Sequence, residues 1–270
     1  RNFTHTREAD IDFSVDGITY ECTDEQTITD TNGTVVLSAS NATIKDCNIN
    51  DNLQITGNNN TINNVDITGT LTINGNGNTV NSASTVGGTT TITATGTDTT
   101  LSNVTLDGAT SIALGATNTV IDNSTIKATI DIAESGVDIN TNNFILDDAD
   151  TGITSSGNAD SLATASIVDN TFRANVEGQS YTGIDLGNQF TDAITLTNND
   201  MSTATNDEII TGIKVASGTA TITKSTIKST GAAGVGIHLA GGDDHVIGHS
   251  VLANKNEING FLTAINIDAA

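Results

Sequence analysis

The sequence contains no proline, no tryptophan and few aromatic residues, which make up 3% of its 270 positions. Threonine and isoleucine, which suit half-buried strands, and asparagine, aspartate and glycine, which suit tight turns, are abundant instead. No apolar run approaches the roughly 20 residues that a membrane-spanning helix needs. The composition therefore favours short strands joined by tight turns, without membrane insertion by this segment.

Basic residues are scarce as well, since 9 Lys and Arg oppose 32 Asp and Glu and the formal net charge is −23. Phosphate groups are recognised by clustered Lys and Arg, so nucleic acid and anionic membranes are poor partners. The acidic residues are scattered and lack the Gly-Gly-x-Gly-x-Asp periodicity of calcium-binding β-rolls. We therefore expect no cofactor, and calcium bound by the carboxylates is the weaker alternative.

One short pattern, first clear at Thr43–Ile49 and Thr61–Ile67, recurs along the chain. Its first apolar residue, the anchor, returns every 18 residues at first and every 25 to 29 residues later. The anchors are Ile44, Ile62, Val80, Leu101, Ile121, Ile139, Ile167, Leu196, Ile222 and Ile247. Strands that are apolar on one side cannot bury that side alone, whereas stacked coils bury it in one continuous column.

The repeat therefore predicts an all-β fold, a parallel β-helix of about ten coils, in which each coil adds one inter-strand spacing to the length of the stack. Coil lengths that vary, with a tight turn inside the repeat, favour the right-handed form. Residues 1–33 do not follow the pattern and are predicted to form an N-terminal cap, so the β-helix covers residues 34–270. The position three after each anchor changes from apolar, as in Val65, to polar, as in Asn170 and Asn199, which predicts an internal ladder of hydrogen bonds.

Two motifs carry a family resemblance. An Asn-bearing turn precedes Thr171-Phe172, and the strand Thr182-Gly183-Ile184-Asp185-Leu186 has counterparts later in the chain. Both resemble the pectate-lyase-like superfamily of right-handed parallel β-helices over residues 35–267. The resemblance implies the fold, and it is shared by enzymes and adhesins alike, so it does not by itself imply one function.

Polysaccharide-degrading members of that superfamily use clustered carboxylates with His, Arg or Lys. Only three arginines are present, and two of them belong to the cap. If the chain were a hydrolase or lyase, Asp243, Asp244, His245 and Arg173 would be its catalytic residues and would have to converge in one groove. No convergent catalytic set is apparent in the sequence, and we predict a protein without catalytic activity.

Three of the four histidines lie close together, at His238, His245 and His249, with Asp243 between them. Imidazoles and a carboxylate can hold zinc, so these four residues are candidate metal ligands, and a polar surface loop is the alternative. Cys22 and Cys47 can pair in a disulfide if the protein is exported, and two buried free thiols are the alternative.

We predict an extracellular or bacterial cell-surface β-helix, an adhesin or the stalk or passenger region of a longer chain that continues beyond Ala270. Its partner would be a host surface or a glycan, with Tyr181, Phe190 and His238 as candidate binding residues. A polysaccharide-degrading enzyme is the rival function. Ice binding is the third, because outward threonines should stack in a column, at Thr43, Thr61, Thr79 and Thr100.

Overall fold

The computed structural model describes residues 5–7, 11–22, 27–30, 32–155, 164–187, 193–203, 207–231, 233–241, 244–248 and 254–268. It divides into two units, Arg1–Thr125 and Ile126–Ala270. All regular elements that it describes are strands, and their neighbours pair in parallel, as the β-helix prediction requires. Among the described residues, none belongs to a helix that could reach across a membrane.

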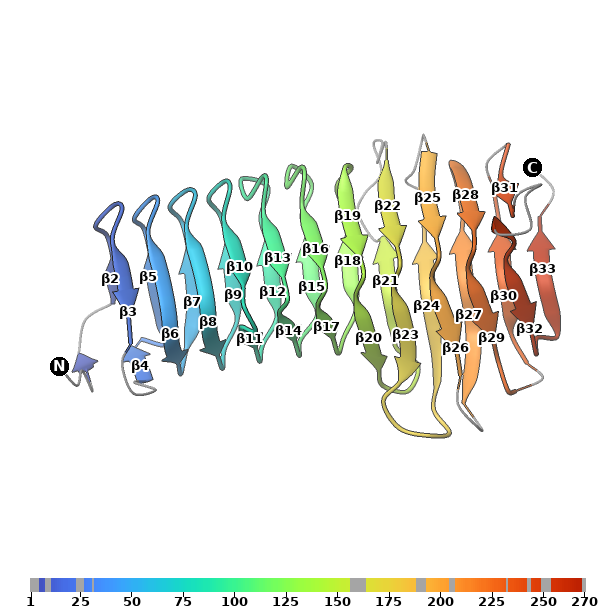
Figure 1. Ribbon diagram of the computed structural model, residues 1–270, viewed down its shortest axis with the longest axis horizontal. Coiled ribbons are helices and arrows are strands. Elements are labelled where there is room, and N and C mark those ends of the chain that lie inside the picture. Colours follow the sequence, from blue (N-terminus) through green and yellow to red (C-terminus); the bar gives the residue numbers. More distant parts are fainter. Residues whose placement is uncertain are drawn as a thin grey trace. The chain divides into compact units, whose positions relative to one another are not determined.

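In the first unit each coil contributes a strand to three columns, named here in chain order (Figure 1). Column 1 consists of β2 (Asp12–Phe13), β5 (Thr34–Leu37), β7 (Asn52–Ile55), β9 (Leu71–Ile73), β12 (Thr90–Ile92) and β15 (Thr110–Ile112). Column 2 consists of β3 (Thr19–Glu21), the first halves of β6 (Thr43–Ile49) and β8 (Thr61–Ile67), β10 (Thr79–Asn81), β13 (Thr100–Ser102) and β16 (Val120–Asp122). Column 3 consists of β1 (His5–Arg7), β4 (Thr27–Asp30), the second halves of β6 and β8, β11 (Thr85–Val86) and β14 (Thr105–Leu106).

The second unit repeats the arrangement, and β17 (Thr125–Ile126) spans the division between the units. Its column 1 consists of β18 (Ile130–Ile132), β21 (Thr151–Ser155), β24 (Ser180–Leu186), β27 (Glu208–Val215), β30 (Val235–Leu239) and β33 (Thr263–Ile267). Column 2 consists of β19 (Val137–Asn140), β22 (Ala165–Val168), β25 (Ala193–Thr197), β28 (Thr219–Thr223) and β31 (Val246–Ile247). Column 3 consists of β20 (Asn143–Leu146), β23 (Thr171–Ala174), β26 (Asp200–Ser202), β29 (Thr226–Lys228) and β32 (Glu257–Asn259).

The anchors face the interior of the coils. Nine of the ten, from Ile44 to Ile222, are fully buried, and Ile247 near the chain end is partly exposed. Alternate residues of the strands point outward, so polar side chains sit between buried ones, as in the pair Leu53 and Ile55 around Gln54. Stacked apolar side chains therefore form the core of each unit.

The turn between columns 2 and 3 explains the asparagine and aspartate at that point of the repeat. Its outermost residue has a positive φ, at 53° for Asn64 and 54° for Asn103, a conformation that Asn and Asp adopt more readily than most residues. The copy of the repeat that runs from Thr79 to Val86 has one extra residue at this turn, and Ser82 and Ala83 both have positive φ. As a result Ala83 is exposed and Ser84 takes the inward position, so the inward placement predicted for Ala83 is wrong.

The predicted ladder is present at the inward position three after the anchor. In the second unit the Asn170 amide Nδ2 donates to Asn199 Oδ1 at 3.1 Å and to the Ile139 carbonyl at 2.7 Å. Asn199 Nδ2 donates in turn to the Ile167 carbonyl at 2.8 Å, and the ladder continues through Ser225. Both asparagines are fully buried. Their amides satisfy one another and the backbone, which makes inward Asn compatible with an apolar core.

The strand motif with glycine has a packing reason. A Cβ atom at Gly152 would lie 2.7 Å from Phe172, and one at Gly183 would lie 2.5 Å from the Met201 sulfur. Glycine at this point of column 1 therefore makes room for the large side chain that column 3 sends across the core. Phe172 itself stacks on Phe144, with ring centroids 4.5 Å apart.

The segment predicted as a cap takes part in the coil. Strands β2, β3 and β4 pair with β5 and β6 and so add one strand to each column of the first unit. Its inward residues are less buried than those of later coils, and Phe13 packs on Tyr20 with ring centroids 4.4 Å apart. The segment is thus a terminal coil with an aromatic contact, and residue 33 is no boundary between strand columns.

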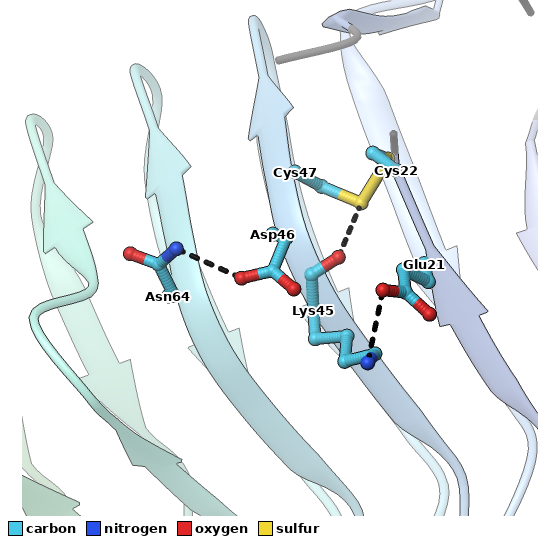
Figure 2. The surroundings of a disulfide bond; sticks show 6 residues. All are labelled: Glu21, Cys22, Lys45, Asp46, Cys47 and Asn64. Carbon is cyan, nitrogen blue, oxygen red and sulfur yellow. Dashed lines mark hydrogen bonds and ion pairs between the residues drawn. A yellow bond between two sulfur atoms is a disulfide. The ribbon is translucent and has the colours of Figure 1, made fainter. Parts of the chain in front are cut away.

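A disulfide connects this terminal coil to the next. Cys22 follows β3, Cys47 lies inward on β6, and their sulfur atoms are bonded (Figure 2). On the outer side of the same strands Lys45 Nζ lies 3.0 Å from Glu21 Oε1, so a covalent bond and an ion pair both connect β3 with β6. The alternative of two free thiols does not apply to the structure.

Candidate functional site

Partly exposed polar and charged side chains line up on the outer face of column 1 in the second unit. The register places Thr154 beside Asp185, Asp185 beside Lys214, Lys214 beside His238, and His238 beside Asn266. We call these five residues the contact row. Neighbouring strands lie about 4.8 Å apart, so the row is about 19 Å long.

Buried isoleucines fix the outward direction of the three central residues of the contact row. Ile184, Ile213 and Ile237 directly precede Asp185, Lys214 and His238, and all three are fully buried. Because successive residues of a strand point to opposite faces, each buried isoleucine directs its neighbour toward solvent. His238 faces outward on its strand, and 23% of its side chain is exposed.

Within the row Lys214 pairs with Asp185, and His238 and Asn266 share a carboxylate outside the row, that of Asp268. Lys214 Nζ lies 3.0 Å from Asp185 Oδ1, and about a third of each side chain is exposed. His238 Nε2 lies 2.9 Å from Asp268 Oδ2, and Asn266 Nδ2 donates to the other oxygen of that carboxylate at 3.1 Å. The hydrogen bond with His238 is the main reason why the pKa of Asp268 is lowered.

The row can therefore bind a polar ligand through hydrogen bonds. It presents amine and amide donors together with carboxylate and hydroxyl acceptors along one line. Acid–base cleavage of a glycoside needs a pair of carboxyl groups facing one bond. Asp185 instead faces the cation of Lys214, which favours recognition over catalysis.

The rival catalytic set does not assemble around Arg173. Arg173 lies on β23 in column 3, and its guanidinium is engaged by Asp200 at 2.8 Å and by the Phe172 carbonyl at 2.7 Å. His245 directly precedes β31 in column 2, three strand pairings beyond β22, which is about 14 Å along the column. The expectation that Arg173 and His245 would share a groove is therefore wrong.

Asp200, the partner of Arg173, shows why this pair is structural. Burial alone would raise the pKa of Asp200, but hydrogen bonds from Ser202 and Arg173 outweigh it, so the pKa is lowered. The carboxylate is thus stabilised in its charged form and is a poor proton donor at neutral pH.

His245 is not available as a metal ligand either. Its Nδ1 accepts a hydrogen bond from the Ala220 amide at 3.1 Å, so the proton is on Nε2, which donates to the Gly241 carbonyl at 2.9 Å. Both ring nitrogens are used within the chain, and the metal prediction for His245 is wrong. No three His, Cys, Asp or Glu side chains of the described residues come close enough to hold a metal ion. His249, Asp243 and Phe190 lie outside the described residues.

Tyr181 was predicted to stack on sugar, and that prediction is wrong. Its ring is fully buried in column 1, and its hydroxyl donates to the Phe172 carbonyl at 3.2 Å. Burial raises the pKa of the Tyr181 phenol far above its ordinary value. The tyrosine follows Ser180 at the start of β24, where the outward–inward alternation directs it into the core.

The threonine column that raises the ice-binding alternative is present in the first unit. Thr43, Thr61, Thr79 and Thr100 are in register along column 2, and Thr19 extends the series. The next outward position is irregular and contains Lys45, Asn63, Asn81 and Ser102. The column is therefore a single line of threonines and not a regular two-column array.

The sequence analysis recognised the repeated strands of column 1 but did not follow their outward position from coil to coil, and so it missed the contact row. Asp185, Lys214 and Asn266 are ordinary outward residues in the sequence. Aligning the repeated Gly-Ile-x-Leu strands of column 1 would have brought them into one line with His238.

Comparison of the chain with models of known families, with curated proteins and with solved structures gave no match.

Proposed function

We propose that the chain is a non-enzymatic β-helix of the cell exterior, part of a bacterial adhesin or passenger region, which contacts a glycan on a host surface. The observation that carries the proposal is the contact row, an exposed line of hydrogen-bonding side chains on a rigid sheet face. The motif resemblance to the pectate-lyase-like superfamily is compatible with this proposal, because that group contains adhesins as well as enzymes. Function in such folds resides in the surface and not in the coil itself.

The disulfide supports an extracellular location. Structural disulfides persist in oxidising compartments and are rare in the reducing cytosol. Cys22 and Cys47 connect the coil of β3 covalently to the neighbouring coil of β6.

The negative charge of the chain favours neutral over anionic glycans as ligands. A formal net charge of −23 repels polyanions at moderate salt. Neutral glycans, with hydroxyl groups that can both donate and accept, match the mixed donors and acceptors of the row. We therefore propose a neutral glycan and not a polyuronate, which also disfavours the lyase alternative.

Attachment of the purified chain to immobilised neutral and anionic glycans tests the proposal. We expect binding to a neutral glycan, and loss of most of it in a Lys214→Ala, His238→Ala double variant. The matched control is Thr72→Ala with Thr91→Ala, two outward residues in register on column 1 of the first unit. Equal binding by the two double variants would overturn the assignment of the row. Substitution of Arg173 or His245 should leave attachment intact in any variant that stays folded.

A further inference from the structure

Asparagines at the outer turns of the first unit fall into two groups. The sequence contains six Asn-x-Thr or Asn-x-Ser sites, at Asn2, Asn32, Asn41, Asn59, Asn103 and Asn123. Such sequons mark acceptors of N-linked glycans in exported proteins, provided that the asparagine lies at the surface. A repeat rich in Asn and Thr produces sequons by chance, so the structural environment must decide whether they are usable.

Four of these asparagines occupy the same kind of position. Asn41, Asn59, Asn103 and Asn123 are all exposed, and all have positive φ, between 49° and 57°. Their hydroxyl partners two residues later, such as Thr43 and Thr105, begin the next strand and are partly exposed. Each acceptor amide therefore projects from a turn and not from a sheet face.

The hydrogen bonds separate these four from the three other asparagines with positive φ, one of which, Asn198, lies in the second unit. Asn64, Asn118 and Asn198 also have positive φ but are not followed by a hydroxyl residue at the second position. Each of these three donates its Nδ2 to an aspartate of the neighbouring coil, at Asp46, Asp98 and Asp169 respectively. Figure 2 shows the first of these pairs.

No hydrogen bond involves the side-chain amides of Asn41, Asn59, Asn103 and Asn123 in the part of the chain that the structure describes. A sugar on Nδ2 would thus break no internal hydrogen bond at the sequon positions, whereas it would break an Asn–Asp pair at the other three. At all four described turns, the asparagine of the sequon has a side-chain amide without a hydrogen bond. Chance formation of sequons by the repeat gives no reason for this coincidence.

We infer that the first unit is N-glycosylated at these turns, a modification that goes beyond the proposed function. The donor would be an oligosaccharide linked to a polyprenyl phosphate carrier. The bond between sugar C1 and the carrier's phosphate oxygen breaks, a bond from C1 to Asn Nδ2 forms, and the amide loses one proton as the carrier phosphate leaves. No oxidant or reductant is needed.

The coil spacing limits how many sites can be filled at once. Asn41 and Asn59 lie on neighbouring coils, because Thr43 and Thr61 are paired in register, and Asn103 and Asn123 are neighbours in the same way. Adjacent coils are about 4.8 Å apart, which crowds two glycans attached at equivalent turns. We therefore expect mainly one glycan for each neighbouring pair.

Peptide mapping by mass spectrometry tests the inference on the full chain purified from the cells that produce it. We expect glycan on Asn41 or Asn59 and on Asn103 or Asn123, and conversion of the modified asparagine to aspartate by a glycan-removing amidase. Unmodified asparagine at all four positions would overturn the inference. Glycan confined to Asn2 or Asn32 would overturn it as well, because the free-amide criterion would then have selected the wrong sites.

Variants secreted from a glycosylating host locate the sites independently. Asn→Gln at all four positions should remove the glycan mass, while Asn64→Gln with Asn118→Gln should leave it unchanged. Retention of glycan mass by the four-site variant would contradict the assignment. Attachment to immobilised glycan, measured on the same variants, keeps the test separate from the contact row, which lies on the other unit.

Discussion

Replacement of Asn199 by alanine tests the buried ladder on which the second unit depends. Asn199 Oδ1 accepts hydrogen bonds from the Asn170 backbone N–H at 3.2 Å and from the Asn170 side chain at 3.1 Å. Its Nδ2 donates to the Ile167 carbonyl at 2.8 Å. The Asn199→Ala variant removes these partners from the Asn170 N–H and the Ile167 carbonyl inside the core. A buried group left without its partner costs about 1–3 kcal/mol, so two such groups predict a loss of roughly 2–6 kcal/mol.

The matched control is Asn175→Ala. Asn175 also donates its amide to an oxygen, Asp147 Oδ1 at 2.9 Å, but the pair is exposed and water can replace it. We expect that variant to lose less than about 1 kcal/mol. Urea denaturation of both full-length variants, followed by far-UV circular dichroism, gives the two free energies of unfolding. Equal losses in Asn199→Ala and Asn175→Ala would refute the reasoning that the inward amides stabilise the stack.

Three further predictions concern the core, the disulfide and pH. Replacing Cys22 and Cys47 by alanine opens a link across 25 residues, and urea denaturation should give a loss of about 3 kcal/mol; an unchanged midpoint would argue against the link. Thr90 and Thr110 are buried and in register, and their hydroxyls have no hydrogen-bond partner in the described structure. Thr→Val at both positions should therefore raise the free energy of unfolding, measured by thermal melting, by about 1–2 kcal/mol. A loss of stability would instead indicate that the hydroxyls have a partner such as buried water. The pKa of Asp200 is lower in the folded chain than in the unfolded chain. Its contribution to the free energy of unfolding is therefore present above a pH of about 4 and is lost as the pH falls through the folded-state pKa. The Asp200→Asn variant should show a weaker loss of stability at acidic pH, measured by thermal melting.

The sequence was sufficient to predict the parallel β-helix because each coil repeats the same inward pattern. Anchors such as Ile62 and Ile139 recur with the strand alternation, and only stacking can bury them all. The polar ladder was predictable for the same reason, since Asn170 and Asn199 occupy the inward position of the repeat. The strands before residue 33 were not predictable, because Phe13, Tyr20 and the other residues of that coil do not follow the periodic pattern.

The individual side chains were harder to predict. Tyr181 lies at the end of a long loop in the sequence, and only the first residues of β24 decide that it turns inward. The engagement of both His245 nitrogens depends on backbone groups at Ala220 and Gly241, which no residue pattern reveals. Contacts between residues on different coils become visible only when the register of the columns is known.

The central claim is that this β-helix recognises a glycan without cleaving it. Incubating the purified chain with a panel of neutral and anionic polysaccharides, and measuring both the bound protein and the appearance of new chain ends, tests the claim most directly. We expect retention on a neutral polysaccharide that depends on Lys214 and His238, with no new reducing or unsaturated chain ends. New chain ends produced by the wild-type chain would contradict it.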